Sequence, residues 1–265
     1  MPDAVAASGT GVAVTYGRRI AIAASDFTIP AGRLTAVIGP NGSGKSTLLN
    51  LLTGLVEPAS GTVEVLGTDP VSARARVAYV LQTNAVNEAV PITVREVVAM
   101  GRYAELGPFR PFRDPDRRLV SQAMERLGVT DLHDRHLGEL SGGQRQRVFV
   151  AQGLAQSAEL LLLDEPVTGL DLVSRQRIID VVRDELDLGR TVVYTTHDLA
   201  DAAEADHIIL MASKVFAQGP PDVVLDPDLL STAFGVGIIH FGDGHLALDD
   251  GHHVPGRHVH FERKR

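Results

Sequence analysis

A glycine-rich run at residues 39–47 has the residue types and spacing of a phosphate-binding loop. Glycines let a backbone turn tightly and approach a ligand closely, and successive N–H groups form a nest for anions. An apolar strand expected at residues 34–38 precedes the run, and a helix expected at residues 47–52 adds its positive N-terminus. The pattern predicts a nucleotide site in which Lys45 reaches the β- and γ-phosphates and Ser46 binds Mg²⁺. The run matches G-x-x-x-x-G-K-[ST] and consists of Gly39, Pro40, Asn41, Gly42, Ser43, Gly44, Lys45, Ser46 and Thr47.

Two carboxylates follow a second expected strand. Residues 160–163 are all leucine, a pattern typical of a parallel strand that is covered on both faces. Asp164 and Glu165 come directly after it, at the carboxyl end where α/β sheets place their ligands. We expect Asp164 to hold Mg²⁺ and Glu165 to act as general base toward the attacking water. A third strand, expected at residues 191–195, leads to His197 at the same edge.

A helix start at residues 140–144 is the third candidate site. Ser141 is placed as its N-cap, and Gly142 and Gly143 follow before Gln144. Two glycines inside a helix cost roughly 1 kcal/mol each relative to alanine, so a purely structural role gives little reason for them. Unobstructed N–H groups at a helix start suit a phosphate.

The elements that must position these residues alternate between strand and helix. This order indicates an α/β fold with a mostly parallel sheet and right-handed crossovers. Between about residues 91 and 158 the periodicity is helical, which predicts an inserted helical unit. Tyr16 ends an early strand, where its ring could stack on a base or could simply pack at an edge. Further strands are expected at residues 12–16, 20–27, 61–66 and 77–81, and Gln82 follows the last of them.

Composition limits the partners. The 265 residues carry a formal net charge of -8, with acidic and basic residues interleaved, and contain no cysteine. The broad basic face of a nucleic-acid binder is not expected, and disulfides and thiolate metal sites are excluded. No signal peptide and no apolar stretch of about 20 residues is evident. We therefore expect a soluble cytoplasmic chain that reaches a membrane only through a partner.

Taken together, these motifs resemble the nucleotide-binding subunits of the ATP-binding cassette (ABC) family, with a match over about residues 12–230. The 140–144 run is the family's signature and is far more specific than the phosphate loop. In chain order the matching positions are Tyr16, the phosphate loop, Gln82, the signature, Asp164 and Glu165, Asp171 of the 169–171 loop, and His197.

The resemblance implies a P-loop NTPase cassette with a mostly parallel central sheet, an antiparallel β subdomain and an inserted helical subdomain. It also implies ATP and Mg²⁺ as cofactors and two cassettes that face head to tail. Each ATP would lie between the phosphate loop of one copy and Ser141, Gly142 and Gly143 of the other. Gln82 would complete the Mg²⁺ site and sense the membrane subunit, His197 would contact the γ-phosphate, and Asp171 would couple the two sites.

Segments at residues 94–103, 107–109 and 167–171 look like those of importers of metal ions and metal chelates. Within that group the likeness favours zinc and manganese uptake ATPases, zinc first, while siderophore and haem importers share much of it. The partners implied are a polytopic permease and an extracytoplasmic metal-binding protein, with the cassette dimer on the cytoplasmic face of the membrane. The alternative class is a soluble ABC ATPase without a transport role. Such proteins usually carry two cassettes, a long coiled-coil insertion or a basic surface, whereas this chain has one cassette, no heptad run and an acidic balance.

The expected C-terminal extension, residues 231–265, is rich in histidine. Runs at residues 238–241 and 245–248 could form a hairpin around Gly242, Asp243 and Gly244. The residues beyond could be a solvated tail, or could bind Zn²⁺, although no spacing matches a structural zinc motif. The candidate ligands are His252, His253, His258 and His260.

Overall fold

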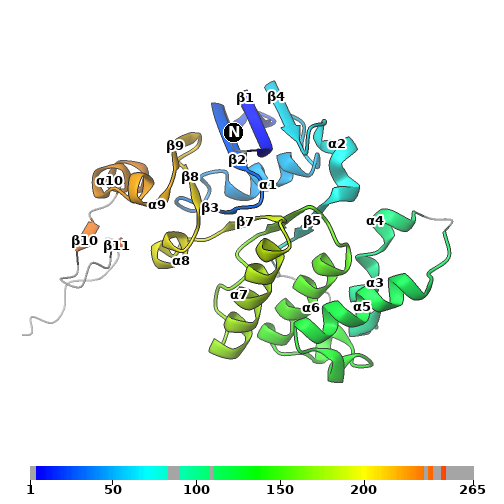
Figure 1. Cartoon of the computed structure of the whole chain (residues 1–265). Helices are drawn as coiled ribbons and strands as arrows, with labels where there is room; N and C mark the ends of the chain where they lie inside the picture. The colour runs from blue at the N-terminus through cyan, green and yellow to red at the C-terminus, as the bar shows by residue number, and fades with distance from the viewer. Residues whose placement is uncertain (1–3, 83–89, 108–109, 236–237, 241–245, 249–265) are drawn as a thin grey trace, which may run out of the picture.

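The computed structural model describes the chain except for residues 1–3, 83–89, 108–109, 236–237, 241–245 and 249–265. Within the described residues the strands form a six-stranded, a three-stranded and a two-stranded sheet. Figure 1 shows the three-stranded sheet on one side of the central sheet and the long helices of the middle of the chain on the other.

The six-stranded sheet is parallel except at one edge. Its order is β5-β6-β7-β3-β8-β9, and only β9 runs antiparallel to its neighbour. This order places β7 between the strand that precedes the phosphate loop and the strand of four leucines. The carboxyl ends of β6, β7 and β3 therefore lie side by side. The strands are β3 (Leu34–Ile38), β5 (Val77–Val80), β6 (Leu160–Leu163), β7 (Thr191–Thr195), β8 (His207–Met211) and β9 (Val215–Gly219).

The three-stranded sheet is antiparallel and covers the first helix. Its order is β2-β1-β4, with β1 (Val5–Tyr16), β2 (Arg19–Pro30) and β4 (Ser60–Val65). Helix α1 (Lys45–Leu52) lies between this sheet and the central one (Figure 1). The four-residue helix α2 (Pro70–Ala73) and the 3-10 turn η1 (Arg74–Arg76) lead from β4 to β5.

Alternate residues of the central strands face two different cores. Leu160 and Leu162 pack with α1 and the antiparallel sheet, whereas Leu161 and Leu163 pack against the helices on the opposite face. Because both faces of β6 are covered, every position of the strand is apolar and buried. The prediction of a fully buried central strand is confirmed.

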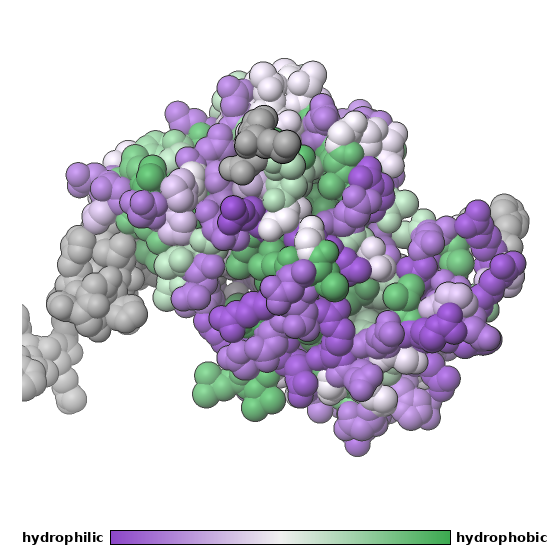
Figure 2. Space-filling view, in the orientation of Figure 1, coloured by the Kyte–Doolittle hydropathy of each residue, from purple (hydrophilic) through white to green (hydrophobic). Residues whose placement is uncertain are grey.

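Five helices form the layer below the central sheet and the lobe beside it (Figure 1). Figure 2 shows mainly hydrophilic residues over α5, α6 and α7 on this face, although Leu172 and Val173 at the start of α7 are exposed. A capping box formed by Thr93 and Glu96 begins α3. These helices are α3 (Val94–Met100), α4 (Tyr103–Leu106), α5 (Asp114–Arg126), α6 (Gly142–Ala155) and α7 (Leu172–Asp187), with 3-10 turns η2 (Thr130–Leu132) and η3 (Leu137–Glu139) between α5 and α6.

The chain ends in short helices and a hairpin beside the central sheet (Figure 1). Helix α8 (Leu199–Ala203) follows β7, and α9 (Pro221–Val224) and α10 (Pro227–Phe234) follow β9. Strands β10 (Ile238–His240) and β11 (Leu246–Leu248) pair antiparallel, as predicted. The expected turn residues 242–244 and all four candidate zinc-binding histidines lie outside the described residues.

Two expectations about element bounds need correction. Helix α1 begins at Lys45 rather than Thr47, so the lysine and Ser46 already belong to its first turn, where free N–H groups point toward the loop. Strands β1 and β2 are each 12 residues long, well beyond the runs expected from alternation. Their pairing contains bulges, which shift the alternation and shorten the apparent pattern.

Candidate functional site

The phosphate loop joins β3 to α1, and its glycines are required by the backbone. Gly39 has φ +146°, and a Cβ there would lie 2.1 Å from the carbonyl oxygen of Met211. Gly44, the residue before α1, has φ +107°, and its Cβ would lie 2.9 Å from the Ala21 carbonyl oxygen. Side chains at these positions are excluded by both conformation and space. The loop is therefore built to keep its backbone bare and close to a ligand.

Lys45 is held inside this loop. Its side chain is buried, and Nζ donates to the carbonyl oxygens of Gly39 at 2.8 Å and Pro40 at 3.2 Å. Burial lowers the pKa of Lys45, while the charges of Glu165 and Asp164 act in the opposite direction. The loop thus encloses an ammonium group whose charge is incompletely compensated, which suits a polyanionic ligand.

An orphaned hydroxyl supports the same interpretation. Ser43 is buried, and its Oγ has no hydrogen-bond partner in the described part of the chain. A buried polar atom without a partner costs free energy unless a ligand or water satisfies it. Together with the bare backbone and the enclosed lysine, this hydroxyl fits a nucleotide phosphate.

The two carboxylates lie beside the loop, as their strand order requires. Asp164 Oδ1 accepts from the buried Thr195 hydroxyl at 2.6 Å, and Asp164 Oδ2 lies 3.5 Å from the Tyr79 hydroxyl. Glu165 donates its backbone N–H to the same Thr195 oxygen at 2.8 Å. Its side chain accepts from Gln82 Nε2 at 2.8 Å. One threonine of β7 thus holds both members of the pair.

Glu165 has a strained backbone. Its φ is +48°, a left-handed conformation that is unfavourable for a residue with a long side chain. The strand has ended at Leu163, so the alternating side-chain directions of an extended strand do not set the directions of these two carboxylates. Strain of this kind persists only where surrounding contacts fix it, and it is frequent at functional sites.

Other predicted residues border this edge at the surface. Tyr16 ends β1 with 49% of its side chain exposed, which leaves a ring free to stack. His197 follows β7 and is exposed, and Ser46 is exposed at the start of α1. No hydrogen bond places any of these three against the carboxylates among the residues that the structure describes.

The signature forms the start of α6, as expected. Ser141 Oγ accepts from the Gln144 backbone N–H at 3.2 Å. In return, the Gln144 side-chain oxygen Oε1 accepts from the Ser141 backbone N–H at 3.0 Å. Gly142 is exposed, and a Cβ there would meet no described atom within 4 Å. Its N–H group is thus open to a ligand from outside the chain.

Gly143 has a packing role that the sequence did not suggest. A Cβ at this position would lie 2.6 Å from Asp171 Oδ2 and 2.7 Å from Ser174 Oγ. Asp171 is the N-cap of α7, and bonds from Ser174 hold its pKa below the ordinary value. The signature and the 169–171 loop are therefore in direct contact within one chain, and one of the two glycines is explained by that contact.

Thr195 is the site residue that sequence reasoning missed. It was counted only as part of a β-rich run, because threonine is an ordinary strand residue. The available signal was its position, since it ends the strand between those that carry Lys45 and Asp164. Within the described residues, no three His, Asp or Glu side chains gather as a metal site by themselves. Mg²⁺ would accordingly need phosphate oxygens in addition to Ser46, Gln82 and Asp164.

The fold and these side chains define a P-loop ATPase. Residues 22–168 match the family model described as ABC transporter. The chain is 40% identical over 229 residues to the manganese transport system ATP-binding protein MntA of Synechocystis sp., covering 85% of this chain and 88% of that protein. It is also 40% identical over 244 residues to the chelated iron transport system membrane protein YfeB of Yersinia pestis, covering 90% and 82%.

Solved structures agree with this assignment. The fold superposes with a TM-score of 0.78 on an inward-facing ABC transporter of metal-chelate type, at 28% identity and over 92% of this chain and 97% of that one. A nucleotide-free ATP-binding cassette at 24% identity shares the fold with a TM-score of 0.73, over 85% and 97% of the two chains. The chain belongs to the ABC transporter family. It is an ATP-binding, ATP-hydrolysing subunit whose partners are a membrane permease and a second cassette.

No helix among the described residues is both long enough and apolar enough to cross a bilayer.

Proposed function

We propose that this chain energises the import of a divalent metal ion, manganese first, by hydrolysing Mg²⁺-ATP at the site built by Lys45, Asp164 and Glu165. The observation that carries the ATPase part is the enclosed, incompletely compensated Lys45 ammonium beside the Asp164–Glu165 pair. The metal is supported by the relatives: MntA is named for manganese and YfeB for chelated iron. Zinc, which the sequence resemblance favoured, ranks behind manganese, and a chelated metal is the second candidate.

In this proposal the side chains of the ATP site take new partners when nucleotide binds. Lys45 leaves the Gly39 and Pro40 carbonyl oxygens for the β- and γ-phosphates. Ser46, Asp164 and Gln82 would hold Mg²⁺, which when bound would neutralise charge on the phosphate oxygens. Glu165 accepts a proton from the attacking water.

The hydrogen bond between Gln82 and Glu165 sets the order of these steps. Gln82 Nε2 donates to Glu165 Oε2 at 2.8 Å, so one carboxylate oxygen is already engaged. When Gln82 releases Glu165, that oxygen becomes free to accept a proton. Glu165 therefore becomes fully available as a base only after Gln82 has moved, which links hydrolysis to a correctly filled site.

The second half of the site comes from another copy. The exposed N–H group of Gly142 supports a role for Ser141, Gly142 and Gly143 in contacting the γ-phosphate held by the partner's loop. His197 contacts the γ-phosphate of the ATP that is bound by the phosphate loop of the same chain. Tyr16 stacks on the base of that ATP, and Asp171 couples the two sites. ATP then stabilises the closed dimer because it contacts both halves, and hydrolysis removes that stabilisation.

The complete system would add an extracytoplasmic metal-binding protein to the permease and the cassette dimer. We place the cassette at residues 1–230, with residues 91–158 as the helical insertion that would face the permease. The expected extension, residues 231–265, begins inside α10, whose Ala233 packs in the core, so its first residues belong to the cassette. Its histidines at 252, 253, 258 and 260 are candidate ligands for the transported metal.

Uptake by vesicles tests the proposal. The chain would be co-expressed with its permease and reconstituted in vesicles, with ATP on the cassette side and Mn²⁺, Zn²⁺ or a ferric chelate on the other. We expect ATP-dependent accumulation of Mn²⁺ and none with Glu165→Gln. Accumulation of the chelate alone would replace the ion by the second candidate. ATP-dependent efflux, or hydrolysis that is indifferent to all three, would reject metal import.

A further inference from the structure

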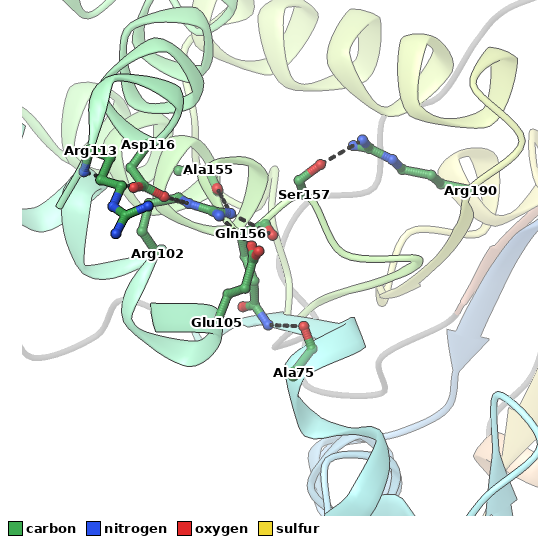
Figure 3. Close-up of polar contacts among 9 residues, drawn as sticks. All are labelled: Ala75, Arg102, Glu105, Arg113, Asp116, Ala155, Gln156, Ser157 and Arg190. Carbon is green, nitrogen blue, oxygen red and sulfur yellow. Dashed lines mark hydrogen bonds and ion pairs between the residues drawn. The ribbon is translucent and has the colours of Figure 1, made fainter. Parts of the chain in front are cut away.

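Arg102 is a buried charge that the ATP site does not use. It lies between α3 and α4, and its side chain is 4% exposed. Figure 3 shows its guanidinium between Asp116 of α5 and the last residues of α6. Burying a charge is costly unless it is paired and hydrogen-bonded, so this position requires a specific reason.

The guanidinium bonds in three directions. Nε donates to Asp116 Oδ1 at 3.1 Å, and Nη2 donates to Glu105 of α4. Nη1 donates to the carbonyl oxygens of Ala155 at 3.0 Å and Gln156 at 3.1 Å. These two carbonyls belong to the end of α6, where the intrahelical donors have run out. A cation there also complements the negative end of the helix dipole.

The end of α6 is anchored to the central sheet as well. Gln156 Nε2 donates to the Val77 carbonyl oxygen at 2.9 Å and lies near that of Ala75 (Figure 3). Arg102 and Gln156 together fix this end between the α3–α5 helices and the start of β5. The opposite end of the same helix carries Ser141, Gly142 and Gly143.

We propose that Arg102 is a positioning residue for the signature, because it holds the end of α6 and so fixes where the start of α6 presents its N–H groups. Helix α6 has 14 residues and is about 20 Å long. A hydrogen-bonded helix moves nearly as a rigid rod, so a tilt at one end displaces the other by a comparable distance. A displacement of about 1 Å at a reacting group can cost about 10²-fold in rate. The inference rests on the composite site proposed above.

The first test separates binding from dimerisation. In a Glu165→Gln background, Arg102→Met and Arg102→Lys should bind a fluorescent ATP analogue as the parent does, because the phosphate loop is untouched. The ATP concentration at which dimers form in size-exclusion chromatography should rise about ten-fold, the effect expected from losing part of a charge-assisted hydrogen-bond set. Lysine still offers a cation to Asp116 but cannot bond both carbonyls, so it carries the test if the methionine variant does not fold.

The matched control is Arg117→Met. Arg117 pairs with Asp114 in α5, but both side chains are exposed, at 66% and 78%, so such a pair contributes little. We expect no change in dimerisation. An equal loss in this variant would show general weakening of the helical lobe and would overturn the positioning role.

The ATPase activity of mixed dimers distinguishes a positioning role of Arg102 from a purely structural one. An Arg102 variant keeps a sound phosphate loop, and Lys45→Ala keeps a sound signature, so their mixture contains one complete composite site and should regain ATPase activity. Gly142→Asp mixed with Lys45→Ala is the reference pair. If the reference pair regains activity and the Arg102 pair does not, Arg102 does not act on the signature. If neither regains activity although mixed dimers are shown to form, the composite site itself is wrong, and this inference with it.

Discussion

Replacing Thr195 by valine tests whether β7 holds the catalytic pair in place. The Thr195 side chain is fully buried and bonds to both members of the pair. Valine has nearly the same shape, so it removes the hydroxyl without leaving a cavity. The Glu165 N–H and one oxygen of Asp164 would then lose a partner where water has little access.

The structure sets the size of the effect. The bond to the Asp164 carboxylate is short, at 2.6 Å, and such a charge-assisted bond contributes about 1.5–3 kcal/mol. The bond from the Glu165 N–H adds about 1 kcal/mol, so we expect a loss of roughly 2–4 kcal/mol in the free energy of unfolding. Freed from this bond, Glu165 can relax its unfavourable φ of +48°. A shift of about 1 Å in the base would lower kcat about 10²-fold.

Thr191→Val is the matched control, since it makes the same change at the other end of the same strand. Thr191 Oγ1 accepts from the Gly32 N–H at 2.9 Å, and Gly32 is exposed. Urea unfolding should show a loss of about 1 kcal/mol or less, and steady-state ATPase assays should show an unchanged kcat. A normal kcat in Thr195→Val, or an equal loss in both variants, would refute the argument. Thr195→Ser, which restores the hydroxyl, should recover most of the activity.

The remaining predictions concern nucleotide, partner and metal. Glu165→Gln should bind ATP but hydrolyse it roughly 10²–10⁴ times more slowly, accumulating as dimers in size-exclusion chromatography; near-normal turnover would remove it from the base role. Lys45→Ala should lose affinity for a fluorescent ATP analogue, because the phosphates lose their fixed cation. Gly142→Asp should bind ATP but fail to form ATP-dependent dimers, since the new carboxylate would meet the γ-phosphate held by the partner. Gly143→Asp should show the same loss and should also lower the unfolding midpoint, because its side chain would displace Asp171. Deleting residues 249–265 should abolish Zn²⁺ binding measured by calorimetry and leave basal ATPase activity intact; zinc binding that survives the deletion would exclude the four tail histidines as its ligands.

Much of the fold could be predicted because its signals are local. Four consecutive leucines can be accommodated only where both faces of a strand are covered, and residues 160–163 are such a strand. The helix start at Ser141 was equally clear, since an N-cap contact spans only three residues. Strands β8 and β9 were not predicted, although β8 is almost entirely buried.

The parts that could not be predicted depend on contacts between distant residues. Thr195 is 31 positions from Asp164, and nothing in its neighbourhood distinguishes it from other strand threonines. Arg102 is 53 positions from Ala155, and its burial reverses the usual expectation for arginine. The left-handed Glu165 is likewise fixed by the Thr195 bond rather than by its own sequence.

The two signature glycines differ in how far the described part of this chain accounts for them. Gly143 is accounted for within this chain, because Asp171 and Ser174 occupy the space of a side chain. Gly142 has open space in the described part of the chain, where alanine would fit and would favour the helix by up to about 1 kcal/mol. The described residues supply no packing reason for this glycine, whereas the composite site proposed above supplies one. A ligand that approaches the bare N–H group would supply that reason, and a second cassette carrying ATP on its own phosphate loop is the partner that this family provides.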